Sequence, residues 1–234
     1  MSKVEIIMSC EHGGNDVPKQ YLHLFQGAEQ TLEGDEGYDI GALTVAKKLA
    51  KNCECPLVSN TISKLLIDVN RSIKSRTLFS EYTWCLLPEE KDAIIRSYYI
   101  PYKEKLTKAI QTKIAQDKKV VHLSVHSFAP VVDGMQRNAE FGLLYDPLRA
   151  EERAFCNDLK TNLVASSPYV TRLNYPHLGT ADSLTVEFRR MFSEANYVGI
   201  EMWINQKLLT DKAIKPKEVF EPLLESIVAT VTTM

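Results

Sequence analysis

Two histidines stand where apolar segments stop, and their ring nitrogens suit metal-assisted hydrolysis. His12 follows the apolar run 4–9 and precedes two glycines, which free the backbone for a tight turn or for close approach to a ligand. His126 closes the apolar run 120–126. Ligands bind at the carboxyl ends of strands in open α/β sheets, and zinc takes nitrogen, oxygen and sulfur donors. We therefore interpret both histidines as metal ligands, although the glycine pair alone also fits a simple turn.

A catalytic zinc site typically has three protein ligands and a water, and the sequence offers several third ligands. Asp39 lies just ahead of a predicted helix over 42–51, where an Asp also serves as a helix cap. Its competitors are Glu11, Asn15, Asp35 and Glu36. Residue types alone do not rank these five side chains firmly, and Asp39 is the choice that we carry forward.

Glu201 interrupts the apolar segment 198–203, which predicts a buried strand. An unpaired carboxylate is costly to bury, and burial raises its pKa toward neutrality. These properties suit a general base or acid. The alternative is a glutamate at a strand edge that faces solvent.

Two Arg–Asn pairs flank predicted strands and indicate a small anionic substrate. Asn70 and Arg71 follow the apolar run 65–69, and Arg137 and Asn138 precede a later strand. A guanidinium group binds a carboxylate through two parallel hydrogen bonds, and a neighbouring amide adds another. We predict that both pairs bind substrate.

The alternation of strand-like and helix-like segments predicts an α/β fold, with a mixed, mostly parallel sheet flanked by helices on both faces. The expected strands cover 4–9, 56–58, 65–69, 120–126, 141–145 and 198–203. The expected helices cover 42–51, 151–165, 219–231 and a longer stretch, 89–116, that Pro101 kinks or breaks. No repeat or linker interrupts the chain, so we expect one hydrolytic domain over 1–234. Strand geometry places His122 on the same face as His126, and we interpret His122 as a packing residue.

Composition narrows the class of protein. The formal net charge of −2 gives no reason to expect a nucleic-acid partner. No apolar run reaches the roughly 18 residues of a membrane span, and the N-terminus lacks a signal-peptide pattern. We therefore expect no membrane partner. The five cysteines are irregularly spaced, and we expect them to be reduced thiols in the cytoplasm. The sequence does not determine the oligomeric state.

Six motifs, in their order along the chain, resemble those of the N-formylglutamate amidohydrolase family. That family is similar in fold to zinc carboxypeptidases and aspartoacylases, and the resemblance runs from about residue 4 to 206. The motifs are SCEHGGN (9–15), DIGA (39–42), IDVNRS (67–72), HLSVHSF (122–128), RNAEFGLLYD (137–146) and GIE (199–201).

The resemblance implies a zinc-dependent enzyme that splits the amide bond of an N-formyl or N-acyl amino acid, such as N-formylglutamate. It assigns His12 and His126 to the metal, Asn70 and Arg71 to a substrate carboxylate, and Glu201 to activation of water. One departure concerns the third ligand. Carboxypeptidase-like enzymes have Glu three residues after the first histidine, where this chain has Asn. Either Asp39 completes the site or metal affinity is reduced.

Two alternatives follow from these residues. Cys10 lies beside His12 and is a potential thiol nucleophile of an amidase. Asn15, in place of the glutamate of carboxypeptidase-like enzymes, also allows a catalytically inactive family member that binds a small anionic ligand, because an incomplete metal site does not activate water.

Overall fold

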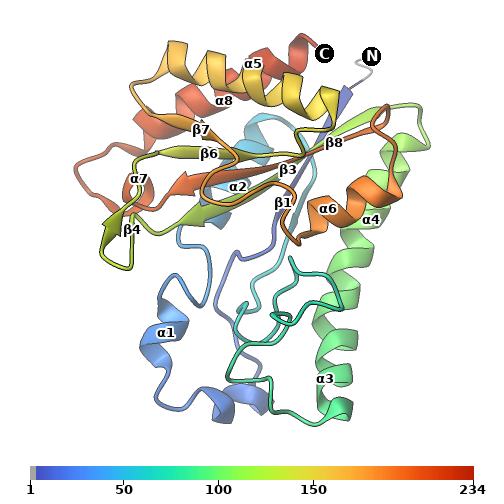
Figure 1. Ribbon diagram of the computed structural model, residues 1–234, viewed down its shortest axis with the longest axis vertical. Coiled ribbons are helices and arrows are strands. Elements are labelled where there is room, and N and C mark those ends of the chain that lie inside the picture. The colour runs from blue at the N-terminus through green and yellow to red at the C-terminus, as the bar shows by residue number, and fades with distance from the viewer. Residues whose placement is uncertain (1–3) are drawn as a thin grey trace.

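The structure, a computed structural model that describes residues 4–234, is built around one six-stranded sheet (Figure 1). The strands lie in the order β2 (Leu57–Ser59), β1 (Val4–Cys10), β3 (Lys119–Phe128), β8 (Tyr197–Asn205), β6 (Phe141–Leu144) and β7 (Thr171–Leu173). The first four strands run parallel, β6 is antiparallel to β8, and β7 is parallel to β6. The predicted mixed, mostly parallel sheet is confirmed.

Helices cover both faces of the sheet, because each strand points alternate side chains to opposite faces. One face packs against α2 (Ala42–Asn52), α5 (Ala150–Ser166) and α8 (Pro216–Thr232). The other packs against α4 (Ile100–Ile114) and α6 (Leu184–Met191). In β3, Val121, Leu123 and Val125 enter the first core. His122, Ser124 and His126 alternate with them and face the second layer, as their spacing predicts.

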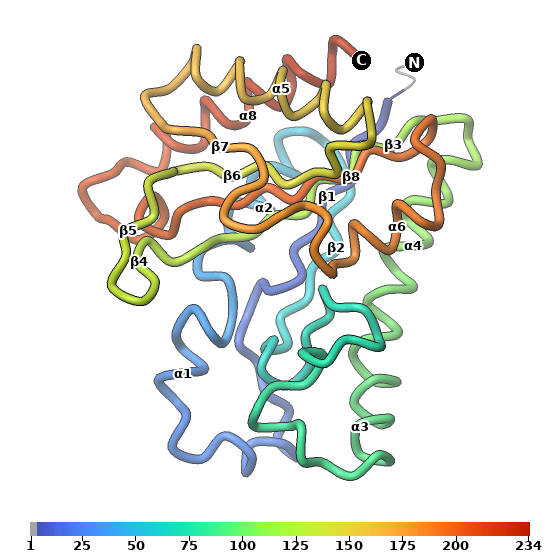
Figure 2. The backbone as a smooth tube through the Cα atoms, viewed as in Figure 1, coloured from blue at the N-terminus to red at the C-terminus, as the bar shows by residue number. Residues whose placement is uncertain are grey.

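Two long connections form the lower part of the molecule in Figure 2. Residues 11–41 join β1 to α2 and include a 3-10 helix (Lys19–Phe25) and α1 (Glu29–Glu33). Residues 60–87 join β2 to α3 (Pro88–Ile94). Both connections leave the carboxyl ends of neighbouring parallel strands, so they meet below the same edge of the sheet.

The predicted strand over 65–69 is wrong. The backbone N–H groups of Leu66 and Ile67 both bond to the Ser63 carbonyl, which makes a turn. Leu66, Ile67 and Val69 are buried, but in the core beneath the sheet. A short apolar run reports burial and does not by itself specify strand pairing.

The break predicted near Pro101 takes the form of a π-helical turn (Ile95–Tyr99) between α3 and α4. Proline lacks an N–H group and interrupts the helical hydrogen-bond ladder. Other predicted elements occur within a few residues of their expected ends. The elements that we did not predict include α6, β7, α7 (Lys207–Thr210) and the hairpin of β4 (Val131–Val132) and β5 (Met135–Gln136).

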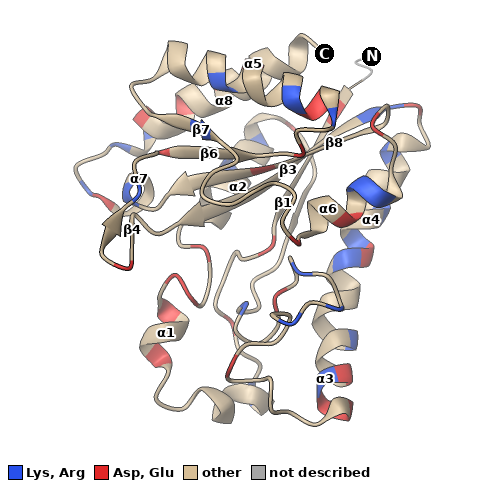
Figure 3. Ribbon diagram, viewed as in Figure 1, with Lys and Arg blue, Asp and Glu red and all other residues tan. Residues whose placement is uncertain are grey.

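Acidic and basic residues are interspersed along α3, α4 and α5 (Figure 3). Within residues 4–234, no helix has the length and apolar character needed to cross a membrane.

Candidate active site

Three buried side chains form a candidate metal site at the carboxyl edge of the sheet. His12 follows β1, Asp39 ends the connection to α2, and His126 lies near the end of β3. Each offers a ligand atom, and these atoms all lie within 4.8 Å of one another. Asp39 Oδ2 is 2.7 Å from His126 Nδ1 and 3.4 Å from His12 Nδ1. The structure thus brings together the three side chains that we interpreted as ligands.

The second nitrogen of His12 determines which atom can bind a metal. His12 Nε2 lies 2.6 Å from Asp68 Oδ1. Because a carboxylate accepts hydrogen bonds, Nε2 carries the proton when the ring is neutral, and Nδ1 keeps its electron pair. Nδ1 is buried and has no hydrogen-bond partner in the described chain. A metal-binding histidine commonly donates its other N–H to a carboxylate, so this orphaned nitrogen fits a cation.

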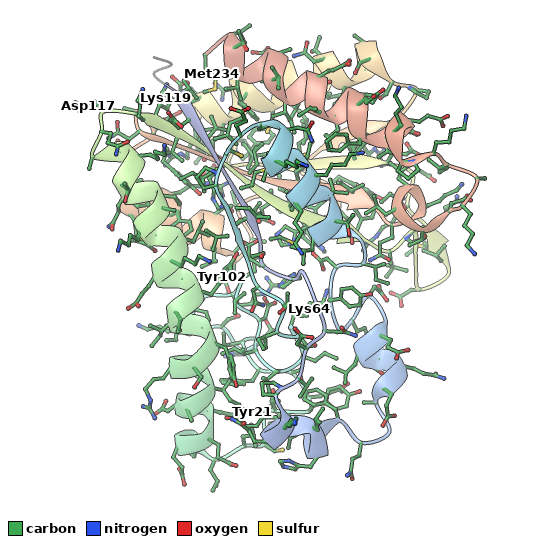
Figure 4. All side chains as sticks on the ribbon, turned by 180° about the vertical axis from the view of Figure 1, so that it is seen from behind. Tyr21, Lys64, Tyr102, Asp117, Lys119 and Met234 are labelled. Atoms are coloured by element: carbon green, nitrogen blue, oxygen red, sulfur yellow. The ribbon has the colours of Figure 1, made fainter. Side chains whose placement is uncertain are left out.

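Electrostatics also favour positive charge here. Burial lowers the pKa of His12, but Asp68 and Asp39 outweigh it and raise that pKa to about 10. Burial raises the pKa of Asp39, yet Lys64 and His12 hold it well below its usual range. Lys64, labelled in Figure 4, places its Nζ 2.9 Å from Asp39 Oδ1, which leaves Oδ2 to face the histidines. The two carboxylates that favour a proton on His12 would equally favour a metal cation at the same place.

The competitors for third ligand are placed less favourably. Glu11 accepts hydrogen bonds from Ser124 and Tyr102, on the Nε2 side of His126. Asp35 and Glu36 are exposed and contribute no atom to the cluster. Asn15 is half-buried and its amide is neutral, so it lacks the charge that the Asp39 carboxylate brings to the histidines.

Glu201 lies next to this cluster with a fixed carboxylate. It is 4% exposed, which removes the alternative of a solvent-facing glutamate. Thr185 donates to Oε1 at 3.0 Å and Trp203 Nε1–H donates to Oε2 at 3.1 Å. Burial raises the pKa of Glu201, but His126 and the donated hydrogen bonds outweigh it and leave that pKa below its usual value. Our expectation of a raised pKa is wrong, and Glu201 is an ionised carboxylate at neutral pH.

A pocket of about 100 Å³ lies beside the cluster, and His12, Asn70, Arg71 and Glu201 line it, whereas Asp39 and His126 are buried and do not. A larger cavity of about 440 Å³ lies between α2, α7 and α8, but none of these groups reaches it. We take the smaller pocket as the candidate active site because the chemically competent side chains converge there.

Arg71 and Asn70 are held at the pocket by the protein's own groups. Arg71 Nε lies 3.3 Å from Asp68 Oδ2, and Nη1 donates to the Asp182 carbonyl at 2.7 Å. Asn70 Oδ1 accepts the Leu184 N–H at 3.1 Å. Within residues 4–234, Arg71 Nη2 and Asn70 Nδ2 form no hydrogen bond, so both nitrogens are available to an anionic group.

Arg137 and Asn138 do not line the pocket. The Arg137 guanidinium group lies over the Phe128 ring at 5.5 Å, beside the β4–β5 hairpin, and Asn138 is exposed. Arg137 is still close enough to lower the pKa of His177, a pocket residue. The structure therefore brings one Arg–Asn pair to the pocket and leaves the other outside it.

Comparison with known proteins identifies the family to which the chain belongs. The chain matches the N-formylglutamate amidohydrolase family over residues 4–209. It belongs to that family. Membership indicates an amidohydrolase, and it agrees with the resemblance of the six motifs. A comparison with curated proteins finds no match.

Two solved structures share the fold of this amidohydrolase family member. A gene product of Agrobacterium tumefaciens is 22% identical with a TM-score of 0.83, over 98% of this chain and 91% of its own. N-formylglutamate amidohydrolase from Ralstonia eutropha is 15% identical with a TM-score of 0.69, over 97% of this chain and 91% of its own. At these identities the likeness establishes the architecture.

Sequence reasoning missed two aromatic residues that line this amidohydrolase pocket. The Trp203 ring stacks on His126, with centroids 4.6 Å apart and planes at 14°. The His177 ring contacts the Trp203 ring edge-on, with centroids 5.1 Å apart. Burial and the nearby Arg137 lower the pKa of His177. Period-two spacing places Trp203 on the same face as Glu201 and could have identified it. His177 lies in a loop without a comparable pattern.

Cys10 lies on the wrong face of β1 for a nucleophile. It packs in the core with Met8 and is fully buried, whereas Ser9 and Glu11 face the active-site side. Burial raises the pKa of the thiol well above its usual value. Reactivity requires a thiolate, so the geometry disfavours a Cys10-dependent amidase.

Proposed function

We propose that the protein hydrolyses the amide bond of an N-formyl or N-acyl amino acid, such as N-formylglutamate, and releases formate (or another acid) and the free amino acid. The observation that carries this proposal is that His12 of the His12–Asp39–His126 cluster lines one pocket together with ionised Glu201 and Arg71. His126 lies directly against this lining, stacked on Trp203. Family membership supports the reaction class.

His12, Asp39 and His126 would hold one divalent ion through two nitrogens and one oxygen, a donor set that suits zinc. Bound zinc supplies Lewis-acid polarisation of the substrate carbonyl and lowers the pKa of water to about 7.

Glu201 acts as the general base in this proposal and then as the general acid. Its carboxylate takes a proton from the attacking water, a C–O bond forms, and the proton passes to the amine nitrogen as the C–N bond breaks. Thr185 and Trp203 each occupy one oxygen of Glu201 and fix its orientation. Trp203 also shields His126 from solvent by stacking on it.

Formate release from N-formyl-L-glutamate, measured beside N-formyl and N-acetyl derivatives of other amino acids, tests the proposal. We expect turnover of at least one N-formyl amino acid by protein that contains one metal ion per chain. Metal-free protein with no turnover of any member of the series would instead support an inactive member that binds a small anion.

Arg71→Lys is expected to raise KM by roughly 10–100-fold with a smaller change in kcat. Lysine keeps the charge but loses the planar guanidinium fork, and a hydrogen bond to a charged group contributes about 1.5–3 kcal/mol. Arg137→Lys is the matched variant, and we expect a weaker effect because Arg137 lies outside the pocket lining. Steady-state kinetics would contradict this assignment if Arg137→Lys had the larger effect on KM.

A further inference from the structure

A buried hydrogen-bonded chain lies behind His126, on the side away from Asp39. Ser124 Oγ lies 2.9 Å from His126 Nε2 and donates to Glu11 Oε2 at 2.6 Å. Tyr102, which reaches in from α4, donates to Glu11 Oε1 at 2.9 Å (Figure 4). His126 and Glu11 are fully buried, and Ser124 is 1% exposed.

The direction of each hydrogen bond follows from the acceptor at the end of the chain. A carboxylate cannot donate, so the Ser124 hydroxyl proton is committed to Glu11. Ser124 Oγ can then only accept from His126, which places a proton on Nε2. Asp39 Oδ2 also only accepts and lies 2.7 Å from His126 Nδ1, so Nδ1 donates to it in this structure; a metal ion bound between them would replace that proton and use the Nδ1 electron pair.

We propose that Glu11, acting through Ser124, is a positioning residue that fixes the tautomer and ring orientation of His126 for metal binding. This inference rests on the metal site of the proposed function. The two histidines are then held in equivalent ways, His12 directly by Asp68 and His126 through the serine.

The strands supply this geometry. Ser124 and His126 are two residues apart in β3, so they share a face of the sheet. Glu11 directly follows β1, the parallel neighbour of β3. Among the described ion pairs, Asp39 is paired with Lys64 and Asp68 with Arg71, whereas the partner of Glu11 is His126. Within residues 4–234, no lysine or arginine forms an ion pair with Glu11 that would offset its effect on His126.

The neighbouring strand provides a matched control. Ser9 is the register partner of Ser124 and lies 2.7 Å from His122 Nε2. His122 bonds to Tyr197 through its other nitrogen and does not line the pocket. Ser9→Ala and Ser124→Ala therefore remove the same kind of buried Ser–His contact, but only one of these contacts involves a proposed ligand.

Tryptophan fluorescence can follow metal binding without an activity assay. The chain has two tryptophans, and Trp84 is 66% exposed. In a Trp84→Phe background, Trp203, stacked on His126, is the remaining reporter. Co²⁺ titration in the presence of a competing chelator gives the Kd from quenching. We expect Ser124→Ala and Glu11→Gln to raise the Kd for Co²⁺ by roughly 10–100-fold, the usual cost of losing such an outer contact. Ser9→Ala should remain within threefold of the background protein.

The outcomes separate the two proposals. Failure of the background protein to bind Co²⁺ would overturn the metal site itself. Binding that is unchanged in both Ser124→Ala and Glu11→Gln, or equally weakened in Ser9→Ala, would overturn only the positioning role. Circular dichroism identifies a variant that fails to fold, in which case the other of the two variants decides.

Discussion

Replacing Glu201 with Gln is expected to lower kcat by at least about 100-fold, the smaller end of the contribution of general acid–base catalysis. Glutamine is nearly isosteric and can still accept from Thr185 or Trp203, but it cannot take a proton from water at neutral pH. Because Glu201 lies outside the three-residue metal cluster, we expect the variant to retain its metal. Formate release and metal content, measured on the same preparation, test both parts.

Glu187→Gln is a matched control for this substitution. Glu187 lies in α6 and pairs with Lys103 of α4, and it does not line the pocket. We expect this variant to retain its activity. An active Glu201→Gln enzyme would remove Glu201 from the mechanism, whereas a variant that loses its metal would indicate a role in the metal site.

The central strands and the residues at their ends could be predicted because two simple rules apply to them. Buried parallel strands read as apolar runs, and their carboxyl ends meet at one edge of the sheet. These rules predict that His12 and His126 lie at a common edge. Glu201 lies in the middle of β8 and could be predicted because a carboxylate interrupts an apolar run. Residue types add both Arg–Asn pairs, and the family motifs then favour Asn70 and Arg71.

Asp39 shows where such rules stop. It follows a connection of about thirty residues, and its backbone N–H bonds to the His12 carbonyl at 2.9 Å. This tertiary contact, not the spacing along the chain, brings the carboxylate to the histidines. Residue types alone likewise could not show that Arg71 reaches the pocket and Arg137 does not. Arg71 follows an apolar run and Arg137 precedes one, so their patterns are similar.

The direction in which the pKa of Glu201 shifts could not be predicted without knowing which side chains surround its carboxylate. Burial alone predicts a raised pKa, and that was our expectation. His126 has the largest effect in the opposite direction, and hydrogen bonds donated to the charged form by Ser183, Trp203 and Thr185 add to it. Thr185 comes from α6, a helix that the sequence pattern did not reveal.

Removing the metal with a chelator is expected to abolish activity and to lower the Tm. A ligand present at a thousand times its Kd stabilises the folded state by about 4 kcal/mol. For a chain of this size, 1 kcal/mol corresponds to roughly 2–4 °C, so we expect a decrease on the order of 10 °C. Calorimetry of the metal-free and zinc-reconstituted protein measures it. Mg²⁺ should restore neither property, because it prefers oxygen ligands in octahedral geometry.

Thiol alkylation distinguishes this result from a Cys10 mechanism. Cys85 is exposed and accessible to alkylating reagents, whereas Cys10 and Cys156 are buried with raised pKa values. We expect the alkylated protein to keep its activity and the chelated protein to lose it. The reverse pattern, activity that survives metal removal but not alkylation, would refute the metal mechanism and favour the thiol. Because Cys10 faces the core that β1 shares with α2, the reagent should reach it only after that core opens.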